Sequence, residues 1–473
     1  MPPEIDIFQA RIGSVTAPAG CGKTQLIADT LSQHTDNKPV LVLTHTNAGV
    51  GALLARLQRA SVSSSVYRVS TIDGFVMRLA GKFPFRTNLD ANVLELVNPN
   101  VDYPLIRGAV QRLLQAGHIS DLIAATYSRL LVDEYQDCTN VQHAIICSIA
   151  QTLPTCILGD PMQAIFGFRE PLVHWEHEAQ AAFPPIAELR TPWRWRLVGT
   201  DALGDWLLQA RASLQAGQPV DLRGAPEEVQ WIKLNQGMET QQRLRAAGIQ
   251  APNRGGSVLV IGDSMNARGR HRISMQTPGA TAVEAVDLDD LVSFARLFDL
   301  ASPNALRQLT EFAASLMTGV GVTNFLARVE TIRGGRARTP PTPAESSAVR
   351  FMEACTYAAS IDLLESFREQ HGARVYRPEV LHCCISALRM AGGEDGFIGA
   401  VIQVRERNRH LGRPQGRRAV GSTLLLKGLE ADVAVILEPH RMTAQHLYVA
   451  LTRGARRVVV CSPTSLITPV ANG

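Results

Sequence analysis

Residues 12–24 read IGSVTAPAGCGKT, an apolar run followed at once by a glycine-rich turn and a Lys-Thr pair. Glycines let a turn direct backbone N–H groups toward a phosphate, and the helix expected over Lys23–Gln33 adds positive charge at its N-terminus. Lys23 would then reach the β- and γ-phosphates of a nucleotide, and the Thr24 hydroxyl would bind Mg²⁺. The alternative is a purely structural turn, and the pattern begins with Ala17 instead of glycine. The predicted nucleotide contacts are Ala17, Pro18, Ala19, Gly20, Cys21, Gly22, Lys23, Thr24 and Gln25.

Residues 130–137 read LLVDEYQD, an apolar strand that ends in acids. An aspartate at the C-terminal end of a buried strand is where a P-loop enzyme holds its Mg²⁺, so Asp133 is the second expected metal ligand. The adjacent Glu134 could orient and deprotonate an attacking water. The alternative is a charged strand end that faces solvent. The glycine-rich loop earlier in the chain favours the catalytic interpretation.

Apolar runs that alternate with helical patterns predict an α/β fold with parallel sheets covered on both faces. In the first part of the chain the predicted strands are Ile12–Thr16, Val40–Thr44, Leu130–Val132 and Cys156–Leu158, and a helix is predicted over Leu105–Leu114. A second α/β unit is predicted from Ser257–Ile261, Asp432–Leu437 and Arg457–Cys461. Helical patterns lie between these strands, as in Leu288–Leu300 and Phe351–Phe367, and Arg333–Pro343 interrupts them.

The bulk composition sets wider bounds. A chain of 473 residues suggests about three folding units. A net charge of +4 and a pI of about 8.7 permit nucleic-acid binding without arguing for it. The sequence has no long apolar run and no apolar leader, so we expect a cytoplasmic protein without a membrane span. The eight cysteines form no CxxC pair, which predicts reduced thiols and no structural metal.

Eight sequence motifs follow one another in a recognisable order. They are the glycine-rich loop, Thr44–Ala48 (THTNA), Ser70–Phe75 (STIDGF), Asp133–Asp137 (DEYQD), Gly159–Arg169 (GDPMQAIFGFR), Thr191–Arg194 (TPWR) and the pair Leu426–Glu430 (LKGLE) and Leu447–Gly454 (LYVALTRG). In this order they resemble the helicase motifs of UvrD/Rep-type superfamily 1 helicases. The resemblance spans nearly the whole chain.

The resemblance implies roles for five further residues. Gln163 would sense the γ-phosphate and its water, Trp193 would stack on adenine, and Glu430 would approach the ribose. Arg194 and Arg453 would be arginine fingers that reach the γ-phosphate from the second α/β unit. Such fingers raise rates by roughly 10³–10⁵. Without the resemblance, the tryptophan would be an ordinary aromatic and the arginines solvated or ion-paired charges.

Phe166 and Phe168 alternate with glycine and precede Arg169. Aromatic platforms bind single strands with little sequence preference, at about 1–3 kcal/mol per base. The alternative is that both phenylalanines belong to the core. By the resemblance, the other residues near the strand's phosphates would be Thr44, His45 and Asn47. Asp73 stands close to a position where the family often has His; an acid is a poor phosphate partner and would instead organise a loop.

Six arginines precede the LKGLE motif and could follow a nucleic-acid backbone, or form a solvated loop or a docking face for a partner. They are Arg405, Arg407, Arg409, Arg413, Arg417 and Arg418.

The resemblance also implies an architecture of two RecA-like parallel-sheet domains with the ATP cleft between them, each with a reduced, mainly helical insertion. The predicted first domain covers 1–79 and 126–195, with a helical insertion over 80–125. The predicted second domain covers 196–275 and 415–473, with a larger insertion over 276–414.

Two departures bear on function. Leu424–Leu426 is apolar where the family has His-Ser-Ala, and both insertions are short. In size and motif layout the chain is similar to compact UvrD-like subunits that work with a nuclease, such as the helicase-like subunit of the Gabija antiphage system. The first hypothesis is an ATP-driven 3′-to-5′ translocase or helicase on single-stranded or tailed DNA. The second is a DNA-end-sensing ATPase that regulates a partner nuclease without processive unwinding. A P-loop ATPase with another substrate, and RNA as the strand, remain open alternatives.

Overall fold

The structure is a computed structural model that describes residues 5–96, 99–167, 170–392, 396–408 and 416–471. Its internal contacts divide the chain into two compact units. Unit 1 comprises Met1–Gln230, Pro439–Val458 and Thr464–Gly473, and unit 2 comprises Trp231–Glu438 and Val459–Pro463. Among the described residues, no helix has the length and hydropathy that a membrane span requires.

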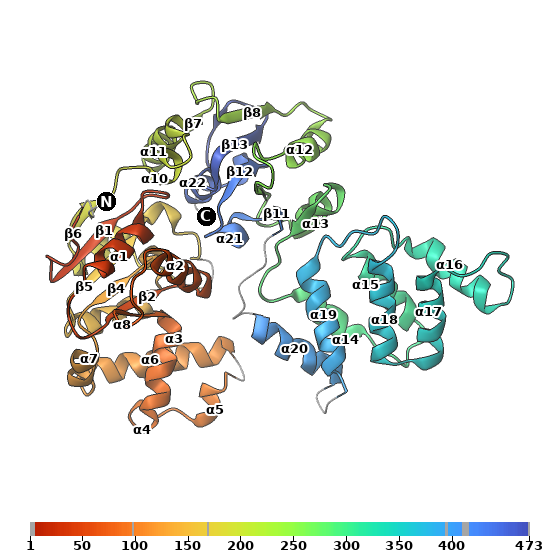
Figure 1. The fold of residues 1–473 in the computed structure, drawn as a ribbon, viewed down its shortest axis with the longest axis horizontal. Helices are drawn as coiled ribbons and strands as arrows, with labels where there is room; N and C mark the ends of the chain where they lie inside the picture. Colours follow the sequence, from red (N-terminus) through yellow and green to blue (C-terminus); the bar gives the residue numbers. More distant parts are fainter. Residues whose placement is uncertain (1–4, 97–98, 168–169, 393–395, 409–415, 472–473) are drawn as a thin grey trace. The chain divides into compact units, whose positions relative to one another are not determined.

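A six-stranded sheet forms the centre of unit 1, in the order β3-β2-β4-β5-β1-β6, and its neighbouring strands pair in parallel (Figure 1). The strands are β1 (Ile12–Thr16), β2 (Val40–Thr44), β3 (Tyr67–Thr71), β4 (Leu130–Val132), β5 (Thr155–Gly159) and β6 (Pro185–Glu188). Because parallel strands end at the same edge, the loops after β1, β2, β4 and β5 meet there.

Helices cover both faces of this sheet, as the fully buried strand sequences require. On one face, α1 (Lys23–Ser32) and α2 (Asn47–Arg59) share a core with β2 residues Val40 and Val42. On the other face, β2 residues Leu41 and Leu43 pack with helices α3 (Ile72–Lys82), α6 (Pro99–Gln115) and α8 (Asn140–Ala150). The alternation of neighbouring residues between the two cores follows from the twofold period of a strand.

Shorter elements complete unit 1. The region predicted as a small helical insertion contains α4 (Pro84–Thr87), α5 (Ala91–Leu94), α6 and α7 (Ser120–Thr126). After β6 come α10 (Trp193–Arg196), α11 (Asp201–Gln215) and β7 (Val220–Asp221). From the end of the chain, η4 (Pro439–Arg441), α22 (Ala444–Leu451) and β14 (Leu466–Ile467) return to this unit, where β14 pairs antiparallel with β7.

The second six-stranded sheet has the order β10-β11-β9-β12-β13-β8. Its strands are β8 (Val229–Lys233), β9 (Val258–Ile261), β10 (Ala280–Ala282), β11 (Arg418–Gly421), β12 (Ala431–Ile436) and β13 (Gly454–Ser462). The pairings β10·β11, β11·β9 and β12·β9 are parallel. Helices α12 (Glu239–Ala247), α13 (Ala267–Gln276) and α21 (Thr423–Leu426) also belong to unit 2. Two parallel six-stranded sheets with flanking helices confirm the predicted α/β class with two RecA-like domains.

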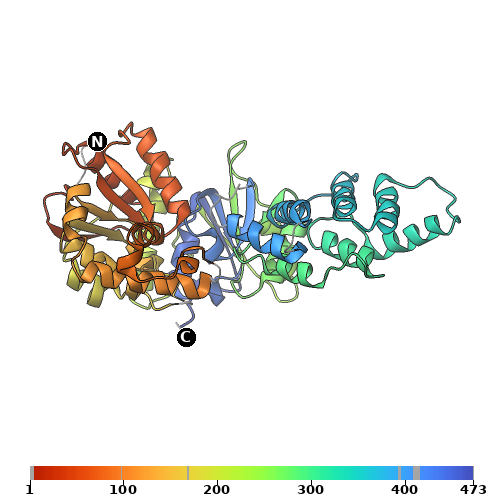
Figure 2. The same ribbon diagram turned by 90° about the horizontal axis from the view of Figure 1, so that it is seen from below.

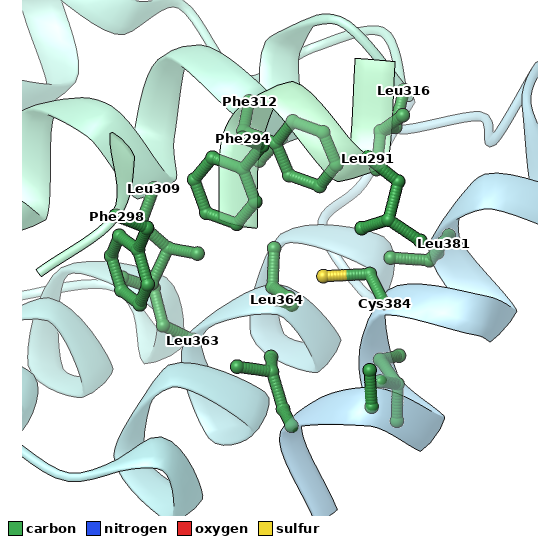
Figure 3. Close-up of a cluster of buried hydrophobic side chains, with 14 of the residues drawn as sticks. Leu291, Phe294, Phe298, Leu309, Phe312, Leu316, Leu363, Leu364, Leu381 and Cys384 are labelled. Atoms are coloured by element: carbon green, nitrogen blue, oxygen red, sulfur yellow. The ribbon is translucent and has the colours of Figure 1, made fainter. Parts of the chain in front are cut away.

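Between β10 and β11 the chain forms a helical body (Figure 2). It contains α14 (Asp289–Leu297), α15 (Ala305–Ala314), α16 (Val322–Arg333), α17 (Pro343–Ala354), α18 (Tyr357–Arg368), α19 (Pro378–Met390) and α20 (Gly396–Asn408). These helices bury one common core, in which Phe294, Phe298 and Phe312 lie beside leucines of α18 and α19 (Figure 3).

Most predicted elements are confirmed, and one is corrected. The helical pattern predicted over Phe351–Phe367 is divided between two helices, because Cys355 adopts a left-handed conformation with φ 47° and ends α17. The predicted break at Arg333–Pro343 separates α16 from α17 as expected. The bounds of the four predicted domains stay predictions.

Candidate nucleotide site

The loop after β1 has a backbone that only glycine accepts at two positions. Gly20 has φ 72° and Gly22 has φ 89°, both in the left-handed region. A Cβ on Gly22 would lie 3.1 Å from Cδ1 of Trp193, and one on Gly20 would overlap the ring of Trp195. Gly22 is also the N-cap of α1 and supplies no side-chain cap, so the first N–H groups of that helix remain open to an anion.

Hydrogen bonds hold this loop against distant parts of unit 1. The Ala17 N–H donates to the Gly159 carbonyl at 2.8 Å, and the Arg194 N–H donates to the Gly20 carbonyl at 3.0 Å. The Ala19 N–H donates to the hydroxyl of the buried Tyr448 at 3.0 Å. The loop is therefore fixed by β5, by α10 and by α22.

Lys23 and the two acids after β4 form a compact ionic cluster. The Lys23 Nζ lies 3.1 Å from Asp133 Oδ1 and 2.6 Å from Glu134 Oε1. Burial lowers the pKa of Lys23, but the charges of Asp133 and Glu134 outweigh it and hold that pKa above its ordinary value. Burial raises the pKa of Asp133, with Glu134 acting in the same direction and Lys23 against it. Glu134 itself takes the left-handed conformation, φ 56°, which turns its side chain back toward Lys23.

A chain of polar contacts runs from this cluster through the GDPMQAIFGFR motif. Gln136 donates from Nε2 to Glu134 and accepts the Asp160 N–H at 3.0 Å. The Asp160 carboxylate in turn accepts from Gln163 Nε2 at 3.1 Å. Gln163 Oε1 lies 3.5 Å from Nη2 of Arg453. Residues from three sequence-distant motifs thus form one hydrogen-bonded path between the ionic cluster and an arginine.

The two arginines expected as fingers both lie in unit 1, next to each other in space. Arg453 is 3% exposed and donates from Nε to the Val449 carbonyl at 2.9 Å. Arg194 donates from Nη1 to the Thr452 carbonyl at 2.7 Å, and its guanidinium lies 5.3 Å from the ring centroid of Trp195. The contacts of α22 therefore attach the last motif to the unit that holds the glycine-rich loop.

The remaining predicted nucleotide contacts differ in how close they lie to the glycine-rich loop and in whether their side chains already have partners. Thr24 is the second residue of α1, beside Lys23. The side chain of Gln25 is engaged elsewhere, since it donates to Asp29 at 2.7 Å and accepts from Arg56 at 3.1 Å. Glu430 belongs to unit 2, so its ribose contact stays a prediction.

The predicted strand-binding residues lie at the loops after β2 and β5. The ring of His45 stacks on Phe166 with centroids 6.0 Å apart and an interplanar angle of 28°. Thr44 is fully buried at the end of β2, while Asn47 is exposed at the first turn of α2. Phe168 and Arg169 lie outside the described residues. A half-buried histidine and phenylalanine therefore form an aromatic pair at the edge where the strands end.

Asp73 does not face a ligand. Arg107 donates to both of its oxygens, at 2.7 and 2.8 Å, and Gln142 donates at 3.1 Å. Burial raises the pKa of Asp73, but the hydrogen bonds and charge of Arg107 outweigh it and lower that pKa. Arg107 also pairs with Glu170 at 3.0 Å. Asp73 thus ties α3 to α6 and α8, in keeping with the organising role expected for an acid at this position.

The arginine cluster before the LKGLE motif is not one surface. Arg418 is buried in β11 and donates to the carbonyls of Ala247 and Gly248, so it has a structural role there. Arg405 pairs with Glu406 at 2.9 Å. Arg409 and Arg413 lie outside the described residues, leaving Arg407 and Arg417 as the described members of the proposed backbone-following set.

Sequence reasoning missed several residues of the site. Gln136 and Asp160 lay within recognised motifs, but only their mutual contacts reveal their part in the path. Asp160 is fully buried and pairs with Arg211 of α11 at 2.9 Å. Tyr448 reaches the loop from α22. For Arg211 no sequence pattern gave a signal, because a lone arginine in an amphipathic helix is ordinarily solvated.

The donor set of the loop fits a nucleotide with a divalent cation. The two glycines take left-handed conformations that turn the loop at the start of α1, and Lys23, whose side chain is 10% exposed, places a cation there. Asp133 and the Thr24 hydroxyl are oxygen ligands of the kind Mg²⁺ prefers. Lys23 is already neutralised by two carboxylates, so phosphate oxygens would replace those partners.

The fold and this site define the class of protein: two RecA-like parallel-sheet domains, with a glycine-rich loop and a strand-end acid pair in one of them. A family model for the UvrD/REP helicase N-terminal domain matches residues 95–184, a stretch that includes the DEYQD and GDPMQ motifs. Together with the fold, this match supports a UvrD/Rep-like superfamily 1 helicase, and that family consists of ATP-using, DNA-binding helicases. No curated protein matches the chain.

Proposed function

We propose that this protein hydrolyses ATP to move 3′-to-5′ along single-stranded DNA. The observation that carries the proposal is the polar path that joins Lys23 and Glu134, through Gln136, Asp160 and Gln163, to Arg453. An ATPase coupled to movement needs its base, its phosphate sensor and its charge-stabilising arginine to respond together, and this path gives them direct contact.

The proposed substrate contacts begin at the loop. The backbone N–H groups over residues 17–24 would surround the phosphates, and Lys23 would exchange its carboxylate partners for β- and γ-phosphate oxygens. Trp193, which lies against Gly22, would stack on adenine, and Glu430 would bind the ribose.

The proposed chemistry is divided among a few side chains. Asp133 and Thr24 would hold Mg²⁺, which supplies positive charge to the phosphates when bound. Glu134 would accept a proton from the attacking water, and Gln163 would orient that water. Arg194 and Arg453 would stabilise the charge that develops on the transferred phosphoryl group.

The proposed strand contacts lie on the same edge of the sheet. The stacked pair His45 and Phe166 presents an aromatic surface to a base, while Asn47 offers an exposed amide for the phosphate backbone. Phe166 is three residues after Gln163, so a base that displaces Phe166 would act on the residue that contacts Arg453. This short segment supports coupling between strand and nucleotide.

A second candidate is a DNA-end-sensing ATPase that regulates a partner nuclease, in the manner of antiphage complexes. The favouring observation is α21, where Leu424, Leu425 and Leu426 replace the polar residues that the family uses to connect strand and nucleotide. Such a protein would hydrolyse ATP in response to DNA without separating a duplex.

The test measures ATP hydrolysis with and without single-stranded DNA, and then strand separation on duplexes with a 3′ or a 5′ tail. Lys23→Ala should abolish hydrolysis, and Gln136→Leu should lower DNA-stimulated kcat by about 10–100-fold with little change in KM. Arg190→Ala, which removes an exposed arginine that pairs with the exposed Glu188, is the matched control.

The outcomes separate the two candidates. A second measurement uses single strands that carry a bound protein block at one end. Faster release of the block from the 5′ end than from the 3′ end supports 3′-to-5′ movement. DNA-stimulated hydrolysis without release of any block or strand rejects movement and leaves the regulatory subunit. Hydrolysis that is indifferent to DNA rejects both.

A further inference from the structure

A second cavity lies in unit 2 and shares no residue with the nucleotide site. Its volume is about 570 Å³, within the range of small-molecule sites. One wall is α13 and the other is formed by α14 and α15 of the helical body.

The floor of the cavity is aromatic. Phe294 and Phe312 stack with ring centroids 4.0 Å apart and an interplanar angle of 4°, and Phe298 stacks on Phe294 at 4.9 Å (Figure 3). Leu297, at the rim, is 72% exposed. The three phenylalanines are only 8–9% exposed, so a ligand with a flat apolar part would cover mainly Leu297 and the parts of the rings that line the cavity.

Two unpaired cations stand on the α13 wall. Arg268 and Arg272 are exposed, lie one helical turn apart and line the cavity. Within the part of the chain that the structure describes, neither guanidinium has a hydrogen bond or an ion pair. The two lining carboxylates do have partners: Asp290 pairs with Arg377 at 2.7 Å, and Glu311 lies 3.7 Å from an arginine of its own helix. The charges that remain for a ligand are therefore positive.

The cavity also holds a polar atom that needs a donor. Gln308 Oε1 is buried and has no hydrogen-bond partner among the described residues, while its Nε2 donates to the Leu297 carbonyl at 3.3 Å. A buried acceptor left unpaired costs about 1–3 kcal/mol, so this oxygen favours a ligand with an N–H group.

We propose that this cavity binds a 5′-phosphorylated nucleoside. Its base would lie on the phenylalanines and donate to Gln308 Oε1, and its phosphate would bind Arg268 and Arg272. A purely apolar ligand would leave both guanidiniums without a partner, and a simple anion would leave the phenylalanines of the cavity floor uncovered. The ligand is either a free nucleotide or a terminal nucleotide of a DNA strand, and the proposal is independent of the function assigned to unit 1.

The experiment is titration calorimetry of the full chain carrying Lys23→Ala, with deoxyadenosine 5′-monophosphate as the probe. A monophosphate lacks the β- and γ-phosphates that the loop of unit 1 would hold. Arg268→Ala/Arg272→Ala should weaken binding by about tenfold or more, because each charged hydrogen bond is typically worth a factor of that size. Arg296→Ala is the matched control: it removes an exposed arginine of α14 that does not line the cavity, and should leave the affinity unchanged.

Two further arms identify the ligand. Ribose 5-phosphate should bind at least about tenfold more weakly than the nucleotide, since it has no base to stack. If the source is a DNA end, binding of a short 5′-phosphorylated single strand should require the same two arginines. If only binding of the monophosphate requires them, the ligand is a free nucleotide. The proposal is overturned if neither ligand depends on Arg268 and Arg272, or if ribose 5-phosphate binds as tightly as the nucleotide.

Discussion

The buried pair between Arg211 and Asp160 gives the sharpest test of how the site is held. Arg211, on α11, donates to Asp160 Oδ1 from Nη2 at 2.9 Å and from Nε at 3.3 Å. Asp160 is 0% exposed and Arg211 is 7% exposed. The same carboxylate accepts from Gln163, so the pair supports the path through the GDPMQAIFGFR motif. The perturbation is Arg211→Ala.

Its magnitude follows from the burial. Removing one partner leaves the Asp160 carboxylate buried with only the Met162 N–H and the Gln163 amide as donors. Breaking a buried pair in this way costs about 3–5 kcal/mol. For a unit of this size, that loss corresponds to a fall of roughly 10 °C in Tm. DNA-stimulated ATP hydrolysis should fall as well, because Gln163 loses a fixed acceptor.

The assay is thermal unfolding followed by circular dichroism, with two comparison variants. Arg223→Ala removes an arginine whose carboxylate partner, Asp221, lies at 2.6 Å, but that pair is exposed, so its Tm should not change measurably. Asp160→Asn combined with Arg211→Ala should lose less than the sum of the single changes, since no buried charge is stranded. A Tm for Arg211→Ala equal to that of Arg223→Ala would refute the reasoning.

Three further predictions concern other parts of the molecule. Gly22→Ala forces a Cβ into a left-handed position 3.1 Å from Trp193, so nucleotide affinity measured by fluorescence should fall at least about tenfold while the fold persists. Burial raises the pKa of Glu284, but Arg377 outweighs it and lowers that pKa to about 2 from an ordinary 4.5. The pair therefore stabilises the protein fully above about pH 4.5 and progressively less as pH falls to 2, so the Tm deficit of Arg377→Ala should shrink over that range. Cys355 is exposed, so Cys355→Ser should remove the fastest phase of labelling by a thiol reagent at pH 8.

The sequence predicted best those elements whose signal is local. The run over Val40–Thr44 is apolar at every position but the last and β-branched at three of its five positions, and it forms β2 with those bounds. β3 and β11 were missed because their sequences, YRVST and RAVG, mix charged and polar residues with apolar ones. In β11 the first residue is Arg418, whose charge is satisfied by carbonyls at the end of α12.

Within the candidate site, too, the residues that could be predicted are those with a local sequence signal. Lys23, Asp133 and Glu134 stand in motifs with a strand before them, and the parallel sheet brings them within contact distance. Arg211 comes from a helix without a motif, and only tertiary packing brings it to Asp160. Hydrophobic periodicity and motif spacing each describe a single element of the sequence. A contact between α11 and the loop after β5 therefore cannot be predicted from either segment alone.

The ion pairs of Lys23 suggest an order of events for the proposed hydrolysis. Lys23 is held by Asp133 and by Glu134 Oε1, so the proposed base is paired with a cation. Phosphate oxygens would draw Lys23 away and free Glu134, whose other oxygen remains hydrogen-bonded to Gln136. Because Gln136 also accepts the Asp160 N–H, any shift of Glu134 is transmitted to the segment that carries Gln163. On the proposed function, nucleotide entry thus activates the base and adjusts the phosphate sensor through one set of hydrogen bonds.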